Sequence, residues 1–156
     1  ASSEELRNDR DSFEIYFRQL NDEFLDKGIY LVVERWENFL DAMSETRLQD
    51  EYNNAVKVCD IFVSLFFTKT GKFTEEEFDT AHNQFKDTGK PFIYTFFKSA
   101  PVDIDKVQEN DFLSLVAFKK RLKSLGHFYT LYSSTDDLKL RFRSQLDKLL
   151  NGPLRE

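Results

Sequence analysis

The sequence predicts an α/β fold in which a doubly wound parallel sheet carries helices on both faces. Apolar runs of strand length occupy residues 60–67, 91–98 and 127–133, and stretches with helical periodicity separate them. The run DIFVSLFF at 60–67 is almost continuously apolar, which is typical of a strand buried on both faces. Strands that alternate with helices pair in parallel through right-handed crossovers, and this pattern gives the predicted architecture.

The first part of the chain predicts a helix before any strand. Ser2-x-x-Glu5 has the form of a capping box, apolar side chains recur at helical spacing behind it, and Gly28 closes the helix. The β-branched run IYLVVER at 29–35 is typical of a strand. The strand that such a fold places first, at the centre of the sheet, is missing or truncated, and we expect Ala1-Ser2-Ser3 to be the turn that leaves it.

The remaining helices follow from periodicity and from their end signals. A second helix is predicted from about Leu48 to Val58, and a third, with an apolar side that includes Phe78, ends at Gly89. A loop with Pro101 leads to a fourth helix, which ends near Gly126. Ser134-x-x-Asp137 caps the last helix, which Gly152-Pro153 stops. We therefore expect a single domain over residues 1–152 and a tail at 153–156.

Composition and charge narrow the classes of function. The chain has 156 residues and a net charge of −6, which disfavours binding to nucleic acid. No apolar stretch is long enough to span a membrane, so we expect no membrane contact. The single cysteine, Cys59, lies in an apolar run and is expected to be a buried small side chain in a reducing compartment, which indicates a cytoplasmic protein.

A crevice beyond the carboxyl ends of the strands is where an open parallel sheet binds its ligands. On the predicted topology four segments build this crevice: Ser2-Ser3, Glu34-Arg35-Trp36 with the polar loop that follows, Thr68 to Glu77, and the loop that starts at Lys98-Ser99. Arg10 shares a helical stripe with apolar residues, and an internal ion pair is the favoured explanation over a contact with a ligand.

Glu77 in the stretch TKTGKFTEEEF admits two roles that do not exclude each other. Thr74-x-x-Glu77 is itself a capping box, and this structural role is the favoured one from the residues alone. A carboxylate at the carboxyl end of a strand also suits catalysis. His82 and His127 lack ligand partners at metal spacing, so no metal site is predicted. The nucleotide-binding motifs G-x-G-x-x-G and the P-loop do not occur.

The order of several segments resembles the bacterial TIR-like branch of the TIR superfamily. They are SSEELRNDRDSF, YLVVERWENF, SETRLQDEYNNAV, CDIFVSLFF, an aromatic-x-x-x-Glu pattern and PFIYTFFK. The resemblance implies a flavodoxin-like sheet and hydrolysis of NAD. It assigns the catalytic glutamate to Glu77 and the preceding aromatic to Phe73, and it matches the pocket-shaping loop to Trp36 through about Thr46. Phe73 or Trp36 would stack on a ring of NAD, Ser2 and Ser3 would receive the pyrophosphate, and Glu34 would line the pocket.

The resemblance also implies how such a domain works. NAD is a substrate and no cofactor is required. Activity follows self-association through TIR–TIR contacts, driven by a sensor module fused to this domain in a larger protein of bacterial immune defence. Two alternatives stay open: a non-enzymatic TIR-like adaptor that only self-associates, and a nucleoside deoxyribosyltransferase-like N-glycosidase, which also uses a glutamate to break an N-glycosidic bond.

Overall fold

The computed structural model of the chain describes residues 2–35, 45–71 and 74–154, with only the backbone for residues 45–48. Three strands, β1 (Ile61–Phe66), β2 (Phe92–Lys98) and β3 (Thr130–Tyr132), form a parallel sheet in that order. Ile61 pairs with Phe92 at one end of the β1–β2 ladder, and Phe96 pairs with Thr130 where β3 joins. The predicted parallel arrangement is confirmed.

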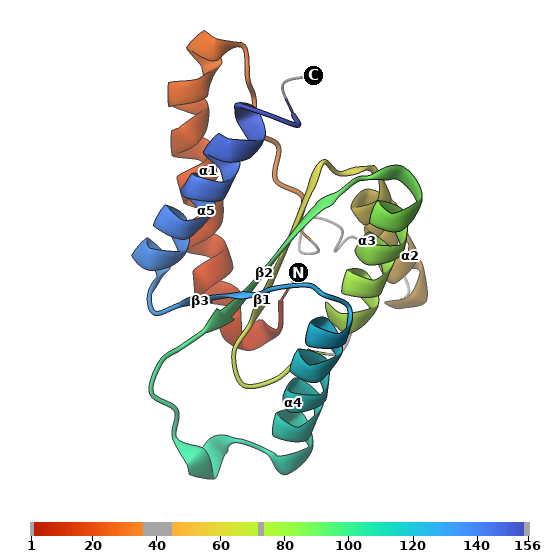
Figure 1. Cartoon of the computed structure of the whole chain (residues 1–156). Helices are drawn as coiled ribbons and strands as arrows, with labels where there is room; N and C mark the ends of the chain where they lie inside the picture. Colours follow the sequence, from red (N-terminus) through yellow and green to blue (C-terminus); the bar gives the residue numbers. More distant parts are fainter. Residues whose placement is uncertain (1, 36–44, 72–73, 155–156) are drawn as a thin grey trace.

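Helices cover both faces of this sheet, as predicted (Figure 1). They are α1 (Arg7–Phe24), α2 (Glu45–Val58), α3 (Thr74–Thr88), α4 (Glu109–Ser124) and α5 (Thr135–Leu150), with short 3-10 turns η1 (Glu4–Leu6), η2 (Leu25–Lys27) and η4 (Ile104–Lys106). One apolar core lies between the sheet and the pair α1 and α5, and a second lies between the sheet and α2, α3 and α4. The fold is therefore an open α/β sandwich compatible with a flavodoxin-like architecture.

The prediction of a strand at 29–35 is wrong. The segment is extended and its side chains alternate between half-buried and exposed, as in a strand, but it joins no ladder among the described residues. Instead, the side-chain amide of Asn21 bonds both backbone groups of Leu31, at 2.6 Å to its nitrogen and 2.9 Å to its oxygen. A β-branched sequence gives the extended shape, but a ladder needs a neighbouring strand.

The N-terminus meets the sheet at the edge of β1 that faces away from β2. Ser2 forms an isolated parallel bridge with Leu65, whose other side pairs with Phe96 of β2. Among the described residues this single bridge is all that represents the strand expected first. Ser2 was expected in the turn that leaves this strand, but it is itself paired with β1, at the outer edge of the described sheet.

Several predicted boundaries shift. The final strand is confined to Thr130–Tyr132 rather than 127–133, and α2 begins at Glu45 rather than near Leu48. The Ser134 cap of α5 is confirmed, because Ser134 Oγ accepts from Asp137 N at 3.1 Å. Gly28 closes η2 just beyond α1 with a φ of 73°, in the left-handed region that glycine adopts without strain. No helix in the described part of the chain is long and apolar enough to cross a membrane.

Candidate functional site

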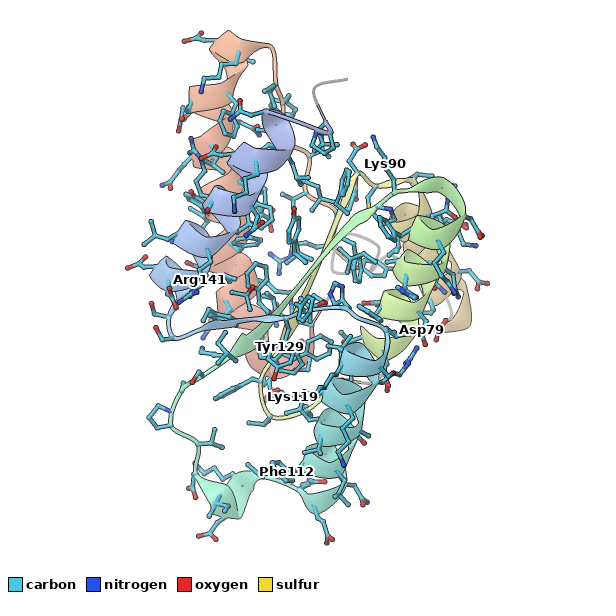
Figure 2. The ribbon with its side chains drawn as sticks, viewed as in Figure 1. Asp79, Lys90, Phe112, Lys119, Tyr129 and Arg141 are labelled. Atoms are coloured by element: carbon cyan, nitrogen blue, oxygen red, sulfur yellow. The ribbon has the colours of Figure 1, made fainter. Side chains whose placement is uncertain are left out.

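The three consecutive glutamates at the start of α3 occupy different environments. Glu75 pairs with Arg121 of α4 at 3.4 Å, and Asp79, labelled in Figure 2, pairs with the same guanidinium. Glu76 is exposed and accepts a hydrogen bond from Asn53 of α2 at 3.0 Å. Glu77 points inward and is only 6% exposed. The first two residues are surface carboxylates, and Glu77 is the one that requires an explanation.

Burial dominates the electrostatics of Glu77. Desolvation raises the pKa of its carboxyl group to about 7, while the polar side chain of Gln49 and the charge of Arg10 act in the opposite direction. The predicted Thr74-x-x-Glu77 capping box does not form, because Thr74 is already the first residue of α3. A capping carboxylate is usually solvated and acidic, whereas Glu77 titrates near neutrality, which is the property expected of a functional acid or base.

Arg10 of α1 binds the N-terminal serines. Its guanidinium is buried, donates to Ser3 O at 2.7 Å, contacts Ser2 Oγ, and lies 3.5 Å from a Glu4 carboxylate oxygen. The ion pair predicted for Arg10 is present, but its partner Glu4 is 61% exposed, so the pair lies at the surface and is not internal. The structure thus brings Ser2, Ser3 and Arg10 together, and the charge of Arg10 acts on Glu77.

The turn before α3 is tied to the N-terminus at two points. The Glu5 carboxylate accepts from the backbone nitrogens of Thr68 at 3.0 Å and Lys69 at 3.3 Å, so the predicted Ser2-x-x-Glu5 capping box is wrong. Gly71 has a φ of +81°, and a Cβ there would lie 2.8 Å from Thr74 Oγ1 and 3.1 Å from Ser3 Cβ. Only glycine permits this close approach of the turn to Ser3.

The other predicted binding residues are not all gathered around Glu77. Glu34 is exposed on the extended segment 29–35 and, with Arg10, lines a cavity of about 1360 Å³ between α1, α5, α2 and β1. Glu77, Ser2 and Ser3 are not among the described residues that line it. Trp36 and Phe73 lie outside the described residues. Arg10 lines this cavity, and its charge acts on Glu77.

A second buried cluster at the carboxyl ends of β2 and β3 was not predicted. Asp9 of α1 is 5% exposed, accepts from the Tyr132 hydroxyl at 2.7 Å and lies 3.1 Å from Lys98 Nζ. Burial and the neighbouring Asp9 carboxylate raise the pKa of Tyr132. In the sequence, this cluster is indicated by the two adjacent charges Asp9 and Arg10 in the first turn of α1, directly before its apolar stripe. This cluster fixes α1 to the strand ends next to the predicted crevice.

The two histidines contact neighbouring side chains of the fold. His127 Nε2 lies 2.9 Å from Thr95 Oγ1, which in turn lies 3.1 Å from Ser64 Oγ, and the His82 ring stacks on Phe78. Burial lowers the pKa of both rings. The described residues hold no group of three or more side chains able to bind a metal ion.

Comparisons with known proteins found no similar sequence or structure. No family model, no curated protein and no solved structure matches the chain.

Proposed function

We propose that this chain is a TIR-like effector domain that cleaves the nicotinamide–ribose bond of NAD, with Glu77 as the catalytic carboxylate. The observation that carries the proposal is the burial of Glu77 just beyond the carboxyl end of β1, with a pKa raised to about 7 and the buried Arg10 nearby. Buried carboxylates with strongly shifted pKa values cluster at functional sites. The aromatic-x-x-x-Glu pattern at Phe73 and Glu77 supports the choice of NAD.

The chemistry suits a site with one carboxylate. When the bond between C1′ and the nicotinamide nitrogen breaks, its electron pair neutralises the positively charged ring, so no acid has to protonate the leaving group. An ordinary glycosidase needs a second carboxyl group for that step. The ribose is left with positive charge at C1′, which an ionised Glu77 stabilises, and water then adds to C1′ and releases its proton to solvent.

Ionisation of Glu77 sets the pH dependence of this reaction. The carboxylate must be charged to stabilise the ribose cation, and its pKa is about 7 in the free domain. Cleavage should therefore rise as the pH increases through this value. A bound nicotinamide ring, being positively charged, lowers the pKa of the carboxyl group and favours the reactive form.

Self-association completes the proposal. In TIR-like enzymes a clustered arrangement activates the domain, and we infer the same for this chain within a larger cytoplasmic defence protein that carries a sensor. The test compares free nicotinamide released from NAD by the dilute chain and by the chain fused to a multimerising scaffold. Glu77→Gln is the decisive variant, and Asp87→Asn, an exposed carboxylate on the same helix, is its charge-matched control.

The expected result is nicotinamide release by the clustered wild type and by Asp87→Asn, and a loss of about 100-fold or more in Glu77→Gln. Unchanged turnover in Glu77→Gln would reject the assignment of this residue. Absence of nicotinamide release from the clustered wild type would reject NAD cleavage and favour the non-enzymatic adaptor alternative. Cleavage of free 2′-deoxynucleosides in preference to NAD would favour the deoxyribosyltransferase-like alternative.

A further inference from the structure

The Glu5 carboxylate joins η1 to the turn at 68–71, which follows β1 and is called here the β1–α3 turn. Glu5 is exposed to solvent, yet both of its carboxylate oxygens accept hydrogen bonds. Oε1 accepts from the backbone nitrogens of Thr68 at 3.0 Å and Lys69 at 3.3 Å. The same oxygen accepts from Ser3 Oγ at 3.1 Å, and Oε2 accepts from Thr68 Oγ1. One side chain therefore binds the turn through its backbone and through a hydroxyl group.

The β1–α3 turn in turn packs against the start of α3. An added Cβ at Gly71 would lie 2.8 Å from Thr74 Oγ1 and 3.1 Å from Ser3 Cβ, so these residues are in close contact. Thr74 is the first residue of α3, is 3% exposed, and stands three positions before Glu77. Residues at this spacing lie on the same side of a helix. The place of Glu77 therefore depends on how the turn packs against the N-terminal segment.

The N-terminal segment is held in place by contacts that do not involve Glu5. Arg10 of α1 is buried, and its guanidinium donates to Ser3 O at 2.7 Å and contacts Ser2 Oγ. Ser2 also forms the parallel bridge with Leu65 at the edge of β1. Removal of the Glu5 side chain should therefore release the β1–α3 turn and leave the segment that carries Glu5 in place.

We propose that Glu5 is a positioning residue, which holds the β1–α3 turn and, through the start of α3, holds Glu77 where it can act on the ribose. This inference rests on the proposed function, in which Glu77 is the catalytic carboxylate. In this scheme Glu5 acts through the turn and not on the substrate. A carboxylate suits the task because it accepts from several donors at once, and hydrogen bonds to a charged acceptor are stronger than those between neutral groups.

The first experiment measures this contact and needs no NAD. Amide hydrogen exchange, followed by NMR, compares the wild type with Glu5→Ala, Glu5→Gln and the control Asp22→Ala, an exposed carboxylate on α1. Exchange at Thr68 and Lys69 should be at least about tenfold faster in Glu5→Ala, because both amides lose a charge-assisted hydrogen bond. The Glu77 amide resonance should shift in the same variant. Glu5→Gln should show smaller effects because its amide oxygen still accepts, and Asp22→Ala should match the wild type.

The second experiment measures nicotinamide release by the clustered protein over a range of NAD concentrations. A displaced Glu77 should lower kcat at least about tenfold in Glu5→Ala with little change in KM, and Glu5→Gln should recover part of the rate. Unchanged exchange at Thr68 and Lys69 in Glu5→Ala would overturn the proposal, and so would faster exchange with an unchanged kcat. Faster exchange and a shifted Glu77 resonance, without NAD cleavage even by the wild type, would support the action of Glu5 on Glu77 and reject the NAD reaction.

Discussion

Replacing Glu77 by glutamine should stabilise the protein at alkaline pH. Burial raises the pKa of Glu77 from 4.5 to about 7, so the folded state binds a proton that the unfolded state has already released between these two values. The free energy of unfolding therefore falls as the pH rises from about 4.5 to 7 and levels off above this window. At about 1.4 kcal/mol per pKa unit, the loss is about 3 kcal/mol.

Glutamine has the shape of the protonated acid but does not titrate, so the variant escapes this loss. Urea unfolding of the wild type and Glu77→Gln should give equal stabilities near pH 4 and a variant that is more stable by about 3 kcal/mol at pH 8. Asp87→Asn, on the exposed surface of α3, should show no such pH-dependent gain. A Glu77→Gln protein that is no more stable than the wild type at pH 8 would refute the claim that desolvation dominates this carboxylate.

Other parts of the molecule give further predictions. The pKa of His127 is lowered by burial and by His82, so the contribution of the neutral ring to stability is fully present above pH 6.5 and is lost below it. Proton NMR should place the titration midpoint of His127 below 6.5, and a midpoint above that value would contradict the lowered pKa. Burial raises the pKa of the half-buried Cys59 from 9.0 to about 11, which lowers the fraction of reactive thiolate about 100-fold. At pH 8 iodoacetamide should therefore alkylate Cys59 about 100-fold more slowly than it alkylates an exposed cysteine in a peptide, and equal rates would contradict the raised pKa. Asn21→Ala removes both hydrogen bonds to Leu31 and should cost about 1–3 kcal/mol in urea unfolding, while Asn83→Ala on exposed α3 surface should cost little.

Local patterns in the sequence identified those features that depend on local interactions. The Ser134 cap, the glycine at the end of the first helical segment and the apolar runs of β1 and β2 all depend on residues near one another in the chain. The extended shape of 29–35 also follows from its β-branched residues. Its lack of ladder partners does not, because pairing depends on which strand lies alongside.

The errors at the candidate site share one cause. Both predicted capping boxes, Ser2-x-x-Glu5 and Thr74-x-x-Glu77, were short-range patterns, and the tertiary structure gives both glutamates other environments. Glu5 bonds the backbone of Thr68, which is 63 residues away along the chain, and Glu77 is buried, so that desolvation dominates its pKa. A spacing of three residues shows where a cap is possible, but it does not show which competing donor the fold brings closer.

The fold buries the Glu77 carboxylate and the Arg10 guanidinium, and desolvation of the ionised carboxylate costs stability. Desolvation alone predicts that Glu77→Gln gains stability at pH 8, whether or not the residue takes part in catalysis. A functional Glu77 adds a second result: the more stable variant loses cleavage, as expected where a site is kept charged at the expense of stability. Measured together, these two quantities decide between a carboxylate retained for chemistry and one retained for the architecture of α3.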